Sequence, residues 1–220
     1  DVFFVISGYL IASVILSEMS ESRFSYANFY ERRIRRILPA LIVVVLSSLI
    51  AALFLSLPEQ LLQTSKSSVF AILGVSNIYF WSESGYFSPA SEYLMLLHTW
   101  SLGVEEQFYL FLPPIFYFVL KTKLNLRVLL ALGLPLLFAL SLWLSFNKPS
   151  VAFYLLPARA WELGLGVALA SGLFPKSKSH RFNAMVAMAG FLMIIASVVI
   201  INKQMAFPGW VALLPCLGTV

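Results

Sequence analysis

Two acidic residues stand side by side in the otherwise apolar stretch "HTWSLGVEEQFYLFLPPIFYFVL", residues 98–120. Glu105 and Glu106 follow His98 and Ser101 near its start. At 3.6 residues per turn, His98, Ser101 and Glu105 share one face of a helix. Imidazole, hydroxyl and carboxylate groups perform acid–base and nucleophilic chemistry. These four residues are therefore the candidates for a catalytic site.

The two glutamates also have a structural interpretation. Carboxylates inside a membrane are costly and usually mark a functional site or face a partner. A rise of 1.5 Å per residue puts Glu105 about 10 Å below the outer end of its helix. However, two consecutive acids cannot share one face, and either could lie at the headgroup boundary or close a structural ion pair.

A second charged pair lies in "ARAWELGLGVALA". Arg159 and Glu162 are one helical turn apart, at positions i and i+3. Arg159 is expected at about the depth of Glu105, so it is a candidate partner for that carboxylate as well. A buried arginine needs such partners, and the pair is interpreted as a structural or pocket ion pair. Gly164 and Gly166 predict close helix contact just beyond it.

Four arginines precede an apolar run in "FYERRIRRILPAL": Arg32, Arg33, Arg35 and Arg36. If the helix has already begun there, several of them share a face at spacings of three or four residues. Paired guanidinium groups suit phosphate or pyrophosphate oxygens better than point charges do. The alternative is a topology signal that contacts anionic lipid headgroups.

The composition indicates which kind of secondary structure positions these residues. The chain is 60% hydrophobic and 11% charged, with a mean hydropathy of +0.88, which excludes an ordinary soluble domain. Barrel strands would alternate in polarity, and these runs do not. We expect an all-α, polytopic transmembrane helical bundle. The net charge of +5 is assigned to cytoplasmic loops and not to nucleic-acid binding.

The positive-inside rule gives the expected order of crossings, because it places the four arginines in the cytoplasm. Residues 58–97 are then an external excursion with a possible re-entrant segment. About six to seven membrane helices follow from segment lengths. The expected inward runs are residues 1–17, 98–120 and 151–174, the expected outward runs are 38–57, 128–146 and 184–201, and a last run begins near Trp210.

Metal and disulfide chemistry find no support in the sequence. Cys216 is the single cysteine, and we interpret it as a small packing residue. No zinc motif and no phosphate-binding glycine loop occurs, so we expect no metal site. Both ends of the chain read as interrupted apolar segments, and we interpret the sequence as a piece of a longer protein.

Three stretches, "DVFFVISGYLI", "FYERRIRRILPALIVV" and "LLHTWSLGVEEQFYLFLPPIFYF", closely resemble the bacterial acyltransferase 3 family of membrane O-acyltransferases, which acetylate O-antigens and peptidoglycan. "ARAWELGLGVALA" extends the resemblance to about residue 170. It implies a multi-pass protein of the bacterial inner membrane that transfers an acyl group, usually acetyl. The implied donor is cytoplasmic acetyl-CoA, with no permanently bound cofactor, and the acceptor is a hydroxyl of an extracytoplasmic glycan or lipid-linked sugar.

The resemblance also implies residue roles. Arg32, Arg33, Arg35 and Arg36 would contact the acyl-CoA. The family's catalytic histidine would belong to a helix preceding Asp1, so that role is not transferred to His98. We therefore expect residues 1–220 to be a single transmembrane acyltransferase domain, incomplete at both ends and inactive alone. The face of His98, Ser101 and Glu105 would line the pocket where acyl group and acceptor meet.

The rival hypothesis is a non-enzymatic polytopic glycan transporter or exporter subunit, in which the same polar groups line a translocation path. The sequence has no internal repeat and no pair of interrupted half-helices, which favours the enzyme. The acceptor and the identity of the acyl group stay open.

Overall fold

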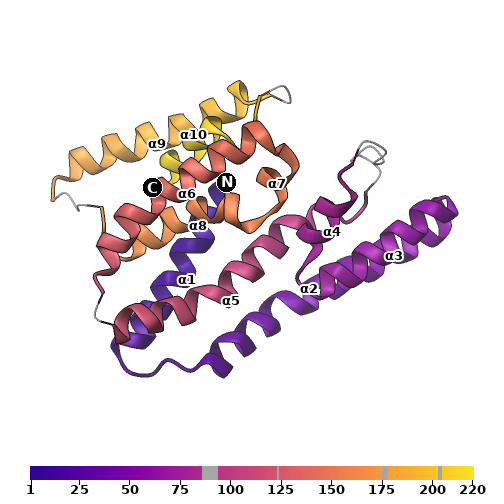
Figure 1. The fold of residues 1–220 in the computed structure, drawn as a ribbon, viewed down its shortest axis with the longest axis horizontal. Coiled ribbons are helices and arrows are strands. Elements are labelled where there is room, and N and C mark those ends of the chain that lie inside the picture. The colour runs from indigo at the N-terminus through magenta and orange to yellow at the C-terminus, as the bar shows by residue number, and fades with distance from the viewer. Residues whose placement is uncertain (86–93, 123, 175–177, 203–204) are drawn as a thin grey trace. The chain divides into compact units, whose positions relative to one another are not determined.

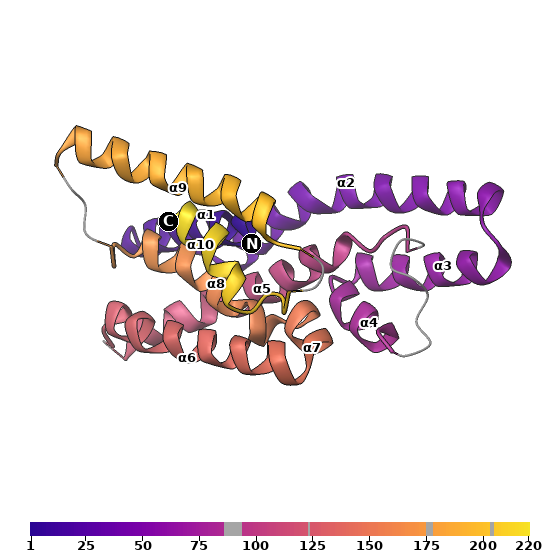
Figure 2. The ribbon, with the colours of Figure 1, turned by 90° about the horizontal axis from the view of Figure 1, so that it is seen from above.

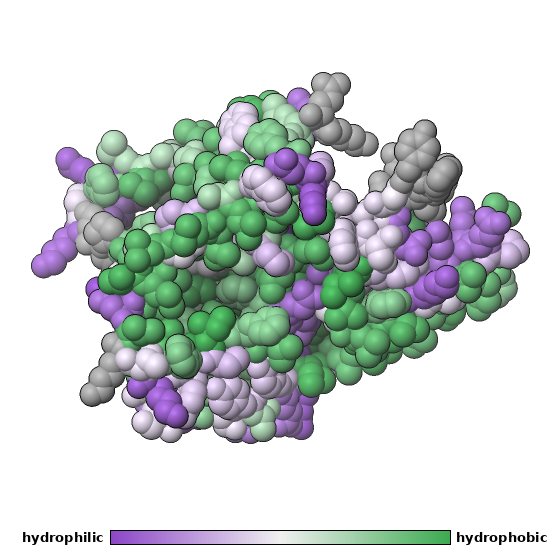
Figure 3. All heavy atoms as spheres, viewed as in Figure 1, coloured by the Kyte–Doolittle hydropathy of each residue, from purple (hydrophilic) through white to green (hydrophobic). Residues whose placement is uncertain are grey.

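The computed structural model describes residues 1–85, 94–122, 124–174, 178–202 and 205–220, and all regular structure within these ranges is helical (Figure 1). The expectation of an all-helical fold is thus confirmed. Within the described ranges, four helices are long and apolar enough to cross a membrane: α1 (Val2–Ser20), α2 (Tyr26–Leu55), α6 (Leu126–Asn147) and α9 (His180–Ile200). Apolar side chains cover much of the face shown in Figure 3, as expected for a protein surrounded by lipid.

Helix α5 (Thr99–Lys121) carries the acidic stretch and has 23 residues, enough to cross. It is not among the four apolar helices, because the run Glu105, Glu106 and Gln107 lowers its mean hydropathy. The predicted helix of residues 98–120 is confirmed to within one residue at each end.

The chain forms two compact units, and the first contains residues 1–22 and 108–220. Helix α8 (Leu156–Ala170) contacts both α1 and α6, and α9 lies beside α10 (Leu213–Thr219) in both ribbon views (Figures 1 and 2). A short 3-10 turn, Trp210–Ala212, precedes α10. Gly8 and Gly166 allow the crossing of α1 and α8, since a Cβ atom at either would overlap backbone atoms of the other helix. The close contact predicted from Gly166 is confirmed.

The prediction of one helical run over residues 151–174 is wrong. The structure has two helices there, α7 (Pro149–Tyr154) and α8, separated at Leu155, which is extended. Pro157 explains the break, because its nitrogen has no hydrogen to donate to the Phe153 carbonyl one turn earlier and its ring clashes there. Arg159 Nε donates to that carbonyl oxygen instead, at 3.2 Å.

The second unit contains residues 23–107. Helix α2 packs on α3 (Pro58–Ile72), which packs on α4 (Ser76–Glu83). The predicted external excursion is therefore helical over much of its described length. Gly74, between α3 and α4, has φ +70°, a backbone conformation that glycine adopts without strain. Neither α3 nor α4 is long enough to cross a membrane alone, and the re-entrant interpretation stays a prediction.

Candidate functional site

A polar seam joins the start of α4 to the first turns of α5 in the second unit. We define the α4–α5 seam as Ser76 and Asn77 from α4 with Thr99, Gly103 and Gln107 from α5. Ser76 Oγ donates to the Thr99 carbonyl oxygen at 2.7 Å. Gln107 Nε2 donates to Asn77 Oδ1 at 2.8 Å, and Asn77 Nδ2 donates to Gln107 Oε1 at 3.4 Å. Asn77 has no exposed surface, so its amide group cannot bond to water and is satisfied by Gln107 instead.

Gly103 makes the close approach at this seam possible. A Cβ atom at this position would lie 2.7 Å from Asn77 Oδ1 and 3.1 Å from the Asn77 nitrogen. Any other residue would push α4 away from α5, because contacts this short are repulsive. The glycine of "SLGVEEQ" therefore stands at the position where α4 and α5 must approach closely for Asn77 and Gln107 to bond.

The two glutamates adjoin the seam. Glu105 is buried, with 3% of its surface exposed, and Glu106 is half-buried. Gly74 lies against the Glu106 side chain, since a Cβ atom on Gly74 would be 3.5 Å from Glu106 Cβ. The turn between α3 and α4 thus covers one acid, while Asn77 holds the neighbouring Gln107.

The arginine cluster lies on α2, which begins at Tyr26, so the helical spacing predicted for it is confirmed. Arg33 is half-buried, and its guanidinium carbon lies 5.8 Å from the centre of the Phe29 ring. The other three arginines are exposed, and Arg35 forms a salt bridge of 2.6 Å with Glu31.

Arg33 lies close enough to Glu106 for its charge to act on that carboxyl group. The side of the membrane on which the arginines and the glutamates lie stays a prediction. Helix α2 begins twelve residues before the apolar run predicted from position 38, so Arg33 lies within the helix and not in a loop ahead of it.

His98 and Ser101 lie in a more open environment than Glu105. His98 is exposed in the turn just before α5, and Ser101 is half-buried. Ser101 Oγ donates to the His98 carbonyl oxygen at 3.2 Å. The predicted polar face therefore runs from an exposed end at His98 to a buried end at Glu105, and the catalytic roles of its members stay predictions.

The first unit contains the second charged group, and its predicted ion pair is confirmed. Arg159 Nη1 lies 2.8 Å from Glu162 Oε1, and neither side chain is exposed. A further carboxylate, Asp1, lies 3.0 Å from the same nitrogen. The guanidinium carbon of Arg159 also lies 5.3 Å and 4.9 Å from the centres of the Phe153 and Phe207 rings. The additional pairing of Arg159 with Glu105 stays a prediction.

Sequence reasoning missed the seam residues Asn77 and Gln107, as well as Asp1 as a partner of Arg159. A signal existed for Asn77, because Ser76 and Asn77 interrupt the apolar run of residues 69–81. Gln107 stands directly after the two glutamates and was overlooked beside their charges. In the described part of the chain, no three His, Cys, Asp or Glu side chains gather into a potential metal site.

Comparison with known proteins gives a family match along the whole chain. A family model described as an acyltransferase domain, the acyltransferase 3 model, matches residues 1–220. An uncharacterized protein of Haemophilus influenzae is 35% identical over 234 residues, covering 100% of this chain and 94% of that protein.

Two relatives carry functional names. The peptidoglycan O-acetyltransferase OatA of Listeria monocytogenes is 32% identical over 177 residues, covering 77% of this chain and 28% of that protein. The O-acetyltransferase OatA of Staphylococcus aureus is 36% identical over 121 residues, covering 54% of this chain and 20% of that protein. The matched part is thus less than a third of either OatA protein. No solved structure matches the chain.

Proposed function

This chain belongs to the acyltransferase 3 family, and from that premise we propose that it transfers an acyl group, most directly acetyl, from acyl-CoA to a hydroxyl of an extracytoplasmic glycan or lipid-linked sugar. The proposal assigns the protein to the bacterial inner membrane. The name of the Listeria monocytogenes relative, a peptidoglycan O-acetyltransferase, supports a glycan acceptor in the cell envelope, and the name of the Staphylococcus aureus relative supports O-acetyl transfer.

The observation that carries the proposal is the cluster of exposed arginines near the start of α2, in a chain that matches the family model over residues 1–220. Acyl-CoA carries phosphate and pyrophosphate groups, and guanidinium groups bind such oxygens through paired hydrogen bonds. The exposed arginines of the cluster, Arg32, Arg35 and Arg36, would bind these groups. Arg33 would link the donor site to the glutamates.

The reaction itself is an acyl transfer. The acceptor hydroxyl gives up its proton, its oxygen bonds to the thioester carbonyl carbon, the carbon–sulfur bond breaks, and CoA leaves as the thiol once protonated. Because Glu105 is buried, its charge would act strongly on nearby groups. We assign to Glu105 the orientation of a basic group at the reaction centre, and to Glu106 the charge balance of Arg33.

The experiment is transfer of label from radiolabelled acetyl-CoA into envelope glycans, using membranes that carry the full-length protein. Glu105→Gln should reduce incorporation at least about a hundredfold, the size expected when a positioned charge is lost from a reaction centre. Arg36→Ala should reduce incorporation at low acetyl-CoA concentration by raising the KM for the donor. Matched controls are Arg181→Ala and Glu59→Gln, which change exposed residues outside the site. Both controls should keep wild-type activity.

Each outcome decides between interpretations. If both site variants retain full activity at normal protein levels, the assigned roles are wrong and the arginines return to a topology signal. If the wild type transfers no label, even when other acyl-CoA donors are supplied, the transferase proposal fails and the transporter hypothesis replaces it. Label found in one glycan fraction identifies the acceptor.

A further inference from the structure

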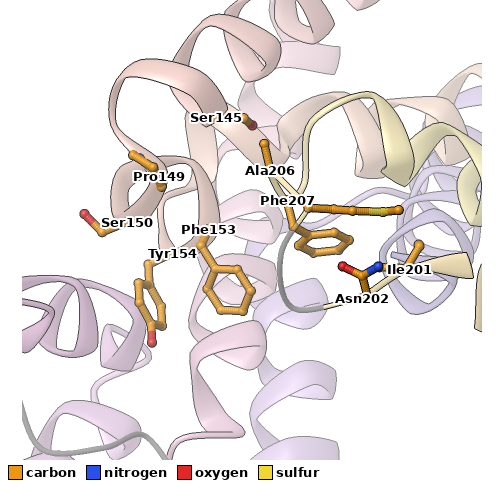
Figure 4. Close-up of a pocket in the computed structure, with 10 residues that line it drawn as sticks. Ser145, Pro149, Ser150, Phe153, Tyr154, Ile201, Asn202, Ala206 and Phe207 are labelled. Atoms are coloured by element: carbon orange, nitrogen blue, oxygen red, sulfur yellow. The ribbon is translucent and has the colours of Figure 1, made fainter.

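A pocket of about 880 Å³ lies in the first unit, where α6 and α7 meet the segment before Pro208. Its volume is in the range of small-molecule sites. Figure 4 shows that residues from three parts of the chain contribute to it: Ser145 from the end of α6, Phe153 and Tyr154 from α7, and Asn202 and Phe207 from the segment after α9. Neither the family match nor the relatives' names assign a role to this pocket.

The pocket lies at the C-terminal ends of α6 and α9, beside Lys148, whereas more basic residues stand around the starts of the two helices. Arg127 stands at the start of α6, and Lys178 and Arg181 flank the start of α9. The positive-inside rule places those starts in the cytoplasm. The pocket, beside Ser145 and Ile201 at the opposite ends, therefore faces the extracytoplasmic side.

The walls of the pocket combine aromatic rings with polar groups. Phe153, Tyr154 and Phe207 supply the rings, while Ser150 and Asn202 add a hydroxyl and an amide. A sugar ring presents apolar C–H faces between hydroxyl groups, so it matches a wall of this mixed character. An acyl chain or a lipid tail would gain nothing from the hydroxyl and amide groups, which would have to be desolvated.

The aromatic wall is held in place from behind. The buried Arg159 guanidinium lies against both the Phe153 and the Phe207 rings, and its Nε donates to the Phe153 carbonyl oxygen. On the other side, the Gly209 N–H donates to Ser145 Oγ at 3.0 Å, which ties the Phe207 segment to α6. A platform fixed before binding loses less entropy when a ligand arrives.

We propose that this pocket is a subsite that binds a pyranose ring of the acceptor glycan. The inference rests on the proposed function, because it takes the acceptor to be an extracytoplasmic sugar. In this assignment Tyr154 stacks on the sugar face and Asn202 hydrogen-bonds a ring substituent. Arg159 acts as a positioning residue that fixes the two phenylalanine rings.

The test measures sugar binding separately from transfer. Full-length protein in lipid nanodiscs, without acyl-CoA, is mixed with the peptidoglycan disaccharide or with triacetylchitotriose, and NMR saturation transfer from the protein to the sugar is recorded. Tyr154→Leu and Asn202→Ala should each weaken binding about tenfold, as expected for the loss of one ring contact or hydrogen bond. Phe146→Leu is the matched control, since Phe146 is an exposed α6 residue outside the pocket lining.

The same variants are then assayed for transfer. A subsite residue should raise KM for the sugar about tenfold while kcat stays near the wild-type value, whereas a merely structural change would lower the amount of folded protein. The subsite is refuted if the wild type does not bind the sugar, or if Tyr154→Leu and Asn202→Ala bind it as tightly as the wild type does. Binding without any acetyl transfer would refute the proposed function and leave the subsite standing.

Discussion

Asn77 and Gln107 hold each other through two amide hydrogen bonds across the α4–α5 seam, of 2.8 Å and 3.4 Å. Their positions are 30 residues apart in the sequence, and Gln107 is the immediate neighbour of Glu106. The pair holds α4 against the turn of α5 that also carries Glu105 and Glu106. The geometry of the acidic site therefore depends on an uncharged contact.

Removing either amide should destabilise the protein by about 1–3 kcal/mol, because the buried partner loses its hydrogen bonds. The double variant Asn77→Ala/Gln107→Ala should cost less than the sum of the single changes. Thermal unfolding of the full-length protein in detergent measures all three. Strictly additive losses would show that the two amides do not act as a pair.

Gly103→Ala should lower acetyl transfer at least about tenfold, since the new methyl group displaces Asn77 and shifts the turn that carries the proposed site residues Glu105 and Glu106. Gly133→Ala is the matched control, because a Cβ atom at Gly133 meets nothing within 4 Å. Helix propensity alone would make both changes neutral or slightly stabilising. Equal activity of the two variants would refute the close-packing argument.

Glu162→Gln should destabilise the first unit by about 3–5 kcal/mol, the usual cost of leaving a buried charge without its partner. Asp1 would still contact Arg159, which puts the expected loss toward the lower value. The yield and melting temperature of the full-length protein report this change, with Glu59→Gln as an exposed control. A melting temperature equal to that of the control would mean that the ion pair adds no net stability.

Salt should raise KM for acetyl-CoA if the exposed arginines bind its phosphates. Between about 0.1 M and about 1 M salt the Debye length falls from about 10 Å to about 3 Å, which weakens attraction between exposed charges. Arg36→Ala should reduce this salt dependence, and Arg181→Ala should leave it unchanged.

Glu31→Ala should change the free energy of unfolding by less than about 1 kcal/mol, because the salt bridge of Glu31 with Arg35 is exposed.

The sequence was a good guide where one residue type decides the outcome. Long apolar runs predicted the four candidate membrane helices, the i, i+3 spacing predicted the Arg159–Glu162 pair, and Gly166 predicted a close helix crossing. Each of these features depends on local periodicity or on the cost of burying charge. The sequence could also be matched to its family through the stretches around Arg32 and Glu105.

The sequence was a poor guide to contacts between distant segments. Nothing in the sequence distinguishes Asn77 and Gln107 from other polar residues, because their contact exists only when α4 packs against α5. In the same way, Asp1 contacts Arg159 only because α1 packs on α8. The break before α8, which Pro157 explains, was also missed. Whether proline bends or ends a membrane helix depends on what replaces its lost hydrogen bond, and here the replacement is the Arg159 side chain.

The pairing of Arg159 with Asp1 constrains how the protein is made. The two residues are 158 positions apart, so α1 has been synthesised long before α8 emerges. Arg159 stands in the first turn of α8. A guanidinium group in a membrane helix disfavours insertion of that helix alone, and α8 has only 15 residues with which to offset this cost. We therefore expect α1 to be in the membrane before α8, so that Asp1 can pair with Arg159 when α8 inserts.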